Sequence, residues 1–434
     1  MWPSEYGPVG DAGRRQHIYA AAANGEAMTR RPTTVENAAL LSVGGIGYGA
    51  LLFVWFSLPA YLSSVTDALG LSGTQAGVLA GAIPLTYIPL GLLSGLVVDR
   101  IGARTGIGVG IALAGLGQFG RASAGGFPSM LALTLLMGVG ATGITFGLPK
   151  LAAELYPPAF VGRAASVYLL ASYAGSATVF AAGRSVLGPA LGGWRPLFLA
   201  SGAVMVALAG AWALLAWFVP AGRHDPDDGA GESGGFALAS LSGDVRAVFA
   251  HRDLRLLVLL GAAYLFVVHG LQGWLVTLFE ARGIAPGLAG GVTAVLVGGQ
   301  ITGVLAVPVV AERFGVTREA LVGCGAVACV GVLGLFFTPT LALLLVLPVI
   351  SVGIGVGGLS PLIRAIPVEI EGIGPALTGT AVGLVFAIGE IGGFLGPVVV
   401  GALRDATGSF APGLALCAIA ALVTVGAGAS MSEL

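Results

Sequence analysis

Residues 95–104 of the chain read GLVVDRIGAR, and residues 310–318 read VAERFGVTR. Three pairs of positions match across the two stretches, each pair 213 residues apart: Asp99 with Glu312, Arg100 with Arg313, and Gly102 with Gly315. One copy lies in each half of the chain. The sequence therefore predicts a protein built from two related halves.

The composition around this repeat indicates a membrane protein. Of 434 residues, 56% are hydrophobic and 9% are charged, whereas soluble domains carry about 25% charged residues. This charge is too low to cover the surface of water-soluble domains, and the apolar content is too high for a disordered chain. The net charge of −1 gives no field that would attract nucleic acid.

Twelve apolar stretches are long enough to cross a bilayer, which takes about 20 residues. They are residues 38–62, 75–98, 105–123, 129–152, 164–187, 195–219, 255–279, 286–311, 319–337, 340–365, 376–400 and 411–430. We therefore expect an all-α membrane protein with twelve transmembrane helices, arranged as two pseudo-symmetric six-helix bundles.

The predicted bundles cover residues 38–219 and 255–430, with a cytoplasmic linker over 220–254 and short tails over 1–37 and 431–434. Because residues 1–27 are polar and alanine-rich, we expect the native chain to start at Met28. Thirteen Arg and Lys residues fall on the side of the N-terminus and five on the other side. Positive charge collects in cytoplasmic loops, so both termini are expected in the cytoplasm, with the chain in the plasma membrane.

The first repeat, with its spacing Gly95-x3-Asp99-Arg100-x-Gly102-x-Arg104, is similar to the loop signature of the major facilitator superfamily of twelve-span transporters. The resemblance covers residues 30–434 and implies a monomer that works by alternating access. It also implies that a set of loop residues governs conformational change: Gly95, Asp99, Arg100, Gly102, Arg104, Glu312, Arg313 and Gly315. LPKLAAELYPP and GWLVTLFEARGIAP resemble the cyanate and nitrate/nitrite branches more weakly.

The charges of that loop suggest specific contacts. Asp99 stands at a helix end and can face the positive N-terminus of another helix, for which the eleventh span is the expected partner. Arg100 and Arg104 can pair with acidic groups on adjacent loops, Glu154 among them. The other interpretation is that these are only cytoplasmic positive charges, which would explain neither Gly95 nor Asp99.

Three cations stand near the ends of predicted spans. Lys150 and Arg364 are 214 residues apart, so they occupy matching places in spans 4 and 10. The resemblance implies that spans 1, 4, 7 and 10 line a central cavity. Lys150 and Arg364 would then stand at the mouth of this cavity and attract anions. Arg184 stands at the outer end of span 5. Each of the three can also reach an interface without any role in binding.

Two ionisable residues fall deep inside predicted spans. Glu390 lies about 21 Å along span 11, too deep for easy contact with water. Burial disfavours the ionised carboxylate, which suits a group that binds and releases a proton. His269, at similar depth in span 7, titrates near neutral pH and can pair with Glu390 or with a substrate. A structural hydrogen bond is the competing interpretation for both.

Uncharged polar and aromatic residues complete the expected substrate site. Tyr48 and Trp55 on span 1, Gln272 on span 7 and Gln300 on span 8 can hydrogen-bond or stack on a small ligand. Each of them can equally be ordinary packing. No cluster of metal ligands is present in the sequence, and no cofactor is implied.

The sequence thus predicts a secondary active transporter of a small organic or inorganic anion, coupled to protons. The alternatives are a proton-driven exporter of drugs or metabolites and, more remotely, a membrane receptor that transports nothing. An enzyme is not expected, because HExxH, GxSxG and the nucleotide-binding GxxxxGK[ST] loop are all missing from the sequence.

Overall fold

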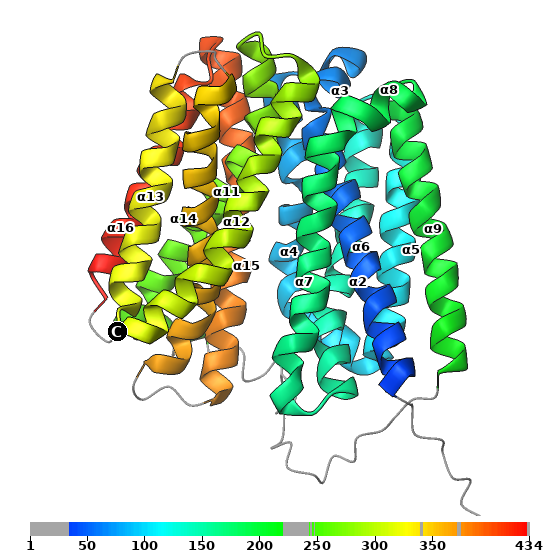
Figure 1. The fold of residues 1–434 in the computed structure, drawn as a ribbon, viewed down its shortest axis with the longest axis vertical. Helices are drawn as coiled ribbons and strands as arrows, with labels where there is room; N and C mark the ends of the chain where they lie inside the picture. The colour runs from blue at the N-terminus through cyan, green and yellow to red at the C-terminus, as the bar shows by residue number, and fades with distance from the viewer. Residues whose placement is uncertain are drawn as a thin grey trace, which may run out of the picture.

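The computed structural model describes residues 34–219, 243, 245–246, 248–338, 342–370 and 375–431. The predicted N-terminal tail up to residue 33, with the expected start at Met28, lies outside the described residues, as do 220–242 of the linker. The described chain forms a bundle of long helices whose axes are roughly aligned (Figure 1).

The first half contains eight α-helices and one π-helical turn within the described residues. They are α2 (Thr34–Ala60), α3 (Leu62–Leu69), α4 (Gly73–Ile101), α5 (Ala103–Arg121), α6 (Phe127–Leu155), α7 (Pro158–Ala182), η1 (Gly183–Leu187), α8 (Gly188–Leu191) and α9 (Trp194–Phe218). The second half contains α11 (Arg252–Ala281), α12 (Pro286–Phe314), α13 (Thr317–Phe337), α14 (Ala342–Glu369), α15 (Pro375–Thr407) and α16 (Ala411–Ala429).

The twelve predicted stretches are helical over nearly their whole described lengths. Ten of the described helices are long and apolar enough to cross a membrane. The other two predicted spans, α4 and α5, have 29 and 19 residues and pack against α6. The prediction of an all-α membrane fold is confirmed.

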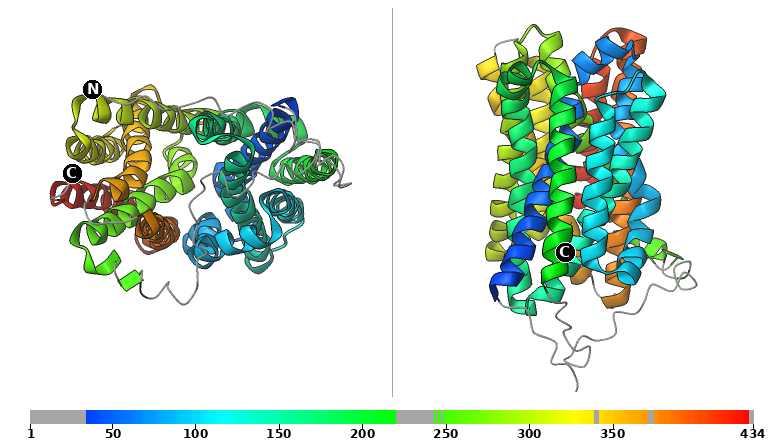
Figure 2. Two further views of the ribbon diagram at one scale, coloured as in Figure 1. Left: turned by 90° about the horizontal axis from the view of Figure 1, so that it is seen from below. Right: turned by 90° about the vertical axis from the view of Figure 1, so that its right-hand side faces the viewer.

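The pattern of neighbouring helices repeats between the halves. In the first half, α2 packs on α7, α6 packs on α4 and α5, and α9 packs on α5. In the second half, α11 packs on α15, α14 packs on α12 and α13, and α16 packs on α13. Seen along the helices, the two sets lie side by side (Figure 2). The repeated sequence thus corresponds to a repeated arrangement of helices.

The two loop glycines of the repeat share an unusual backbone conformation. Gly102, between α4 and α5, has φ +84°, and Gly315, between α12 and α13, has φ +63°. Side chains with a Cβ rarely adopt positive φ, so glycine allows the chain to reverse within one or two residues. The helices on either side can therefore stay long and lie antiparallel.

The halves contact each other mainly through α4 with α15 and through α7 with α12. At Gly77 of α4 the two backbones approach so closely that an added Cβ would lie 2.3 Å from the carbonyl oxygen of Pro397 on α15. Small residues permit such packing between membrane helices. We call the end of the bundle with α3 and α8 the α3 end, and the opposite end, where α9 leads into the linker, the linker end (Figure 1).

Candidate functional site

Two ionisable side chains of the second half meet near the middle of their helices. His269 of α11 and Glu390 of α15 place Nε2 and Oε2 3.6 Å apart, with both side chains about nine-tenths buried. A pairing of these two residues is one of the options that their depth in the sequence predicts, and the structure brings them together.

An aromatic ring of the first half covers this pair. The indole of Trp55, on α2, stacks on the imidazole of His269 with ring centroids 6.0 Å apart and an interplanar angle of 6°. Trp55 also contacts the ring of Tyr87 on α4, at 5.9 Å between centroids. The His269–Glu390 pair therefore lies where the two halves touch.

The Oε2 atom of Glu390 is buried without a hydrogen-bond partner among the described residues. Burying an ionised carboxylate without partners is expensive, so such a group takes up a proton or pairs with a cation. Protonation of His269 would provide that cation 3.6 Å away. The pair is thus suited to holding a proton out of contact with water.

A second group of polar side chains surrounds Arg364, about five residues before α14 ends at the linker end. Its guanidinium stacks on Phe386 of α15 at 4.3 Å from the ring centroid, and Nη1 donates a hydrogen bond to the Ser360 hydroxyl at 2.5 Å. Four tyrosines lie within range of its charge, Tyr48, Tyr168, Tyr173 and Tyr264. Among the side chains that are described, no carboxylate forms an ion pair with Arg364.

The remaining predicted polar residues divide between the halves. Tyr48 packs on Tyr168 with ring centroids 6.2 Å apart, beside the Arg364 group. Gln272 donates a hydrogen bond to Gln300 at 3.1 Å, and both are buried. These two amides satisfy each other between α11 and α12, so their arrangement here serves packing within the second half.

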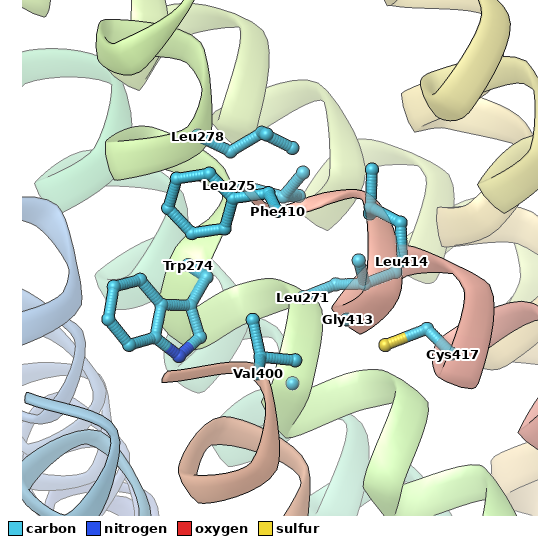
Figure 3. A pocket seen from close by; sticks show the side chains of 10 residues that line it. Leu271, Trp274, Leu275, Leu278, Val400, Phe410, Gly413, Leu414 and Cys417 are labelled. Atoms are coloured by element: carbon cyan, nitrogen blue, oxygen red, sulfur yellow. The ribbon is translucent and has the colours of Figure 1, made fainter. Parts of the chain in front are cut away.

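The small cavity shown in Figure 3 lies between α11, α15 and α16, lined by Trp274, Val400 and Phe410 with other apolar residues. Its volume is about 10 Å³, roughly the space of one water molecule. It is a packing void and has no room for a substrate.

Lys150 is paired within its own half. Its Nζ lies 2.6 Å from Oδ1 of Asp99 and 3.3 Å from the carbonyl oxygen of Val98. Glu154 interacts electrostatically with Lys150 and with Arg104. The expected contact of Asp99 with the N-terminus of α15 falls on residues 375–380, whose side chains are not among those described.

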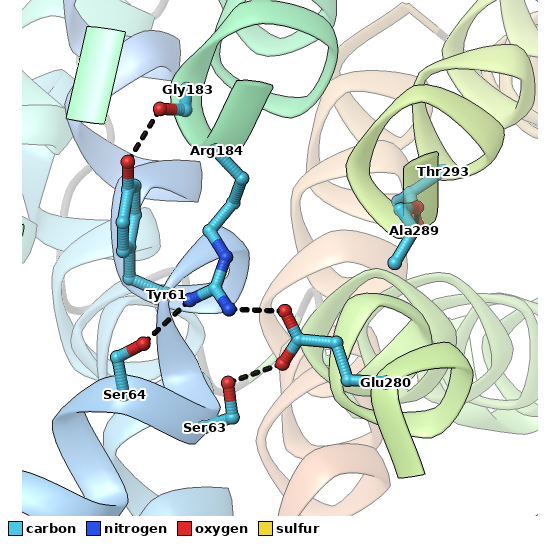
Figure 4. A network of polar contacts seen from close by, with 8 residues as sticks. All are labelled: Tyr61, Ser63, Ser64, Gly183, Arg184, Glu280, Ala289 and Thr293. Atoms are coloured by element: carbon cyan, nitrogen blue, oxygen red, sulfur yellow. Dashed lines mark hydrogen bonds and ion pairs between the residues drawn. The ribbon is translucent and has the colours of Figure 1, made fainter. Parts of the chain in front are cut away.

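Arg184 takes part in a network between the halves at the α3 end (Figure 4). It forms an ion pair with Glu280 of α11 and donates to the Ser64 hydroxyl at 2.6 Å. Ser63 donates to the same glutamate, and Tyr61 donates to the carbonyl oxygen of Gly183. The carboxylate of Glu280 thus connects α11 to α3 and η1.

These ion pairs change the charge balance expected from the sequence. The sequence predicts Lys150, Arg184 and Arg364 as cations near span ends, but Lys150 and Arg184 each have a carboxylate partner here. Of these residues, Arg364 keeps its charge without a described carboxylate partner, near the linker end of α14. Within the described residues, no three His, Cys, Asp or Glu side chains gather as a metal site would require.

A sequence model of the Major Facilitator Superfamily matches residues 44–397. The chain belongs to this superfamily. Its members are transporters rather than enzymes, so the expectation that the chain is not an enzyme is confirmed.

Relatives within the major facilitator superfamily carry organic and inorganic anions by name. The 3-(3-hydroxy-phenyl)propionate transporter of Escherichia coli is 27% identical over 410 residues, covering 91% of this chain and 96% of that one. The nitrate/nitrite transporter NrtP of a Picosynechococcus species is 27% identical over only 26% of this chain and 21% of its own. The predicted similarity to the nitrate/nitrite branch is therefore local.

A solved superfamily structure shows the same fold. A bacterial homolog of the human lysosomal transporter Spinster, in an inward-facing and unoccupied conformation, has a TM-score of 0.74. Its sequence identity is 20%, and the match covers 92% of this chain and 96% of the other. At this identity the likeness concerns the fold alone.

The superfamily loop residues lie in two sets, one at the end of α4 and one at the end of α12. Gly95 lies within α4, and Arg100 is exposed in its last turn. Arg104 is the second residue of α5 and donates to the carbonyl oxygen of Val219 at 2.7 Å. Glu312 and Arg313 are exposed at the end of α12. Their proposed role in conformational change stays a prediction.

Several residues of the site are not indicated by any sequence pattern. Glu280 and Asp405 stand at span ends, where acidic residues are ordinary, and only their contacts across the halves single them out. Of the tyrosines near Arg364, Tyr48 was predicted, whereas Tyr168 and Tyr173 on α7 and Tyr264 on α11 carry no motif. Tyr264, five residues before His269, could have been found by listing polar groups on span 7.

Proposed function

We propose that this protein is a secondary active transporter that carries a small organic anion across the plasma membrane together with protons. An aromatic carboxylate is the substrate class that the site fits best. The observation that carries this proposal is Arg364, a cation set among aromatic rings with no described carboxylate partner.

Arg364 suits a carboxylate because a guanidinium presents paired N–H donors that match two carboxylate oxygens. Phe386 stacks on its face, which leaves the edge of the guanidinium for a ligand. The surrounding tyrosines can pack against an aromatic ring and hydrogen-bond a ring substituent. The relative named for 3-(3-hydroxy-phenyl)propionate supports this choice, since that compound joins a phenol to a carboxylate.

Glu390 and His269 are the proposed proton carriers. They lie 3.6 Å apart and away from water, and Trp55 of the other half covers them. When the halves move, Trp55 no longer covers the pair in the same way, and the access of water to Glu390 and His269 changes. One conformation can then take up the proton and the other can release it. This is the coupling that co-transport requires.

Alternating access is proposed to occur by rocking of the two sets of six helices, with the whole transporter acting as a monomer. We place the linker end in the cytoplasm because positive residues concentrate there. The cross-half hydrogen bonds of Ser63, Gly73, Thr74 and Arg184 lie at the α3 end. These contacts would then close the described conformation to the outside.

The test is uptake of labelled 3-(3-hydroxyphenyl)propionate into proteoliposomes with an inward proton gradient. We expect accumulation that an uncoupler abolishes, and a loss of at least about tenfold in Arg364→Gln, since a charged hydrogen bond is worth about 1.5–3 kcal/mol. The matched control is Arg163→Gln, an exposed arginine near the start of α7.

Two results would contradict the proposal. Equal uptake of an uncharged aromatic alcohol would remove the role of the carboxylate. Accumulation only when the gradient is reversed, together with lowered drug susceptibility of cells, would favour the proton-driven exporter instead.

A further inference from the structure

An apolar groove lies on the second half between α12, α13 and α14. It has a volume of about 250 Å³ and is lined by small and aliphatic residues, among them Ala306, Val310, Ala320, Gly323, Val327 and Gly355. The groove exists because several of these positions are Gly or Ala, which leave space that larger side chains would fill. An added Cβ at Gly323 meets no atom within 4 Å.

The groove lies at the depth of lipid chains near the linker end. Val310 and Ala306 precede the last residue of α12 by four and eight residues, or about 6 and 12 Å. Ala320 and Val327 lie three and ten residues into α13. In a bilayer this region contacts hydrocarbon, and water would find no hydrogen-bond partners in an apolar groove.

Opposite charges lie about one helical turn from groove residues on the same helix faces, Arg313 after Val310 and Glu319 before Gly323. Arg313 follows Ala306 and Val310 on one face of α12, at the spacing i, i+4, i+7, and is exposed. Glu319 precedes Gly323 and Val327 on one face of α13, at the spacing i, i+4, i+8, and is also exposed. Among the described residues, neither forms an ion pair.

We propose that the groove binds a phospholipid whose headgroup carries a phosphate and a primary ammonium, as in phosphatidylethanolamine. One acyl chain lies between α12 and α13, the phosphate contacts Arg313, and the ammonium donates hydrogen bonds to Glu319. An anionic headgroup would be repelled by Glu319, and a trimethylated ammonium cannot donate to it. The assignment stands independently of the transported substrate.

Native mass spectrometry of the purified full-length protein tests this site. The protein is equilibrated with equal amounts of dioleoyl phosphatidylethanolamine, phosphatidylcholine and phosphatidylglycerol, so that only the headgroups differ. We expect phosphatidylethanolamine to be retained preferentially. Glu319→Gln and Arg313→Gln should each reduce its retention about fivefold, the contribution of one charge near a lipid surface.

The binding of the acyl chain is tested by Gly323→Leu, which places a larger side chain at the groove, and whose Cβ meets no atom within 4 Å. We expect about tenfold less bound lipid of every headgroup. The leucine would displace about two methylenes of the acyl chain from the groove. Gly426→Leu is the matched control, since an added Cβ there also meets nothing within 4 Å and Gly426 lies three residues before α16 ends at the same end.

Preferential retention of phosphatidylglycerol would overturn the headgroup assignment. Unchanged lipid binding in Gly323→Leu would show that the lipid does not bind in the groove. Binding of detergent alone would contradict the proposal in the same way. If Gly323→Leu does not fold, the two charge variants still decide the proposal through the headgroup preference.

Discussion

Asp405 of α15 accepts hydrogen bonds from Thr74 in the first turn of α4, in the other half of the molecule. Its Oδ2 accepts hydrogen bonds from the backbone N–H and the hydroxyl of Thr74, both at 2.7 Å, and its Oδ1 accepts one from the N–H of Gly73 at 2.6 Å. A carboxylate at a helix N-terminus satisfies free N–H groups and meets the positive end of the helix dipole. The cap fastens α15 to α4 at the α3 end.

Replacing Asp405 by Asn is expected to weaken closure at the α3 end by about 1 kcal/mol, the typical value of a helix cap. The populations of open and closed molecules would shift about fivefold. Spin labels on cysteines placed at Asp67 and Leu288, both exposed near that end, should then show a larger fraction of long distances. An unchanged distance distribution would mean that the cap does not hold the halves together.

The ion pair of Arg184 and Glu280 is expected to behave as a gate contact. Glu280→Gln leaves a nine-tenths buried guanidinium without its charge partner, a change that typically costs about 3–5 kcal/mol. Transport should fall in Glu280→Gln and in Arg184→Glu, and should recover in part when Arg184→Glu is combined with Glu280→Arg. Uptake by the three variants measures this. No recovery in the exchanged pair would favour direct substrate binding by Arg184.

Glu390→Gln is expected to separate substrate movement from proton movement. The amide cannot ionise, so accumulation driven by a proton gradient should fall to the equilibrium level, while exchange of labelled for unlabelled substrate continues. Both are measured in the same proteoliposomes. Asp67→Asn, a neutral replacement of an exposed acid on α3, serves as the control. Full gradient-driven accumulation by Glu390→Gln would remove this residue from proton coupling.

Gly77→Ala is expected to push the halves apart at the α3 end. The new Cβ would lie 2.3 Å from a backbone oxygen that cannot rotate away, and overpacking of this kind costs about 1–3 kcal/mol. The melting temperature should fall and label distances at the α3 end should increase. Gly162→Ala on α7, where a Cβ meets nothing within 4 Å, should cause neither change.

The sequence carried enough information for the helices and for the repeat. Spans are set by local apolar length, and the turn at Gly102 and Gly315 is set by backbone conformation that only glycine adopts easily. The depth of Glu390 and His269 also followed from counting residues along each helix. All of these are local properties.

The partners of charged residues could not be predicted in the same way. Lys150 and Arg184 were expected as cations at a cavity, yet each pairs with a carboxylate from another helix. Which partner a long side chain reaches depends on how helices are rotated and packed, and one sequence does not state this. The apolar groove beside Gly323 likewise depends on the distance between α12 and α13.

The stack of Trp55 on His269 has a consequence for inhibition. The two rings are nearly parallel, and they belong to the two halves, which in the proposed mechanism move relative to one another in each cycle. A flat, uncharged compound inserted between the two rings would block the movement of the halves. It would not compete with the substrate carboxylate for Arg364. Blockade of that type would be insensitive to substrate concentration.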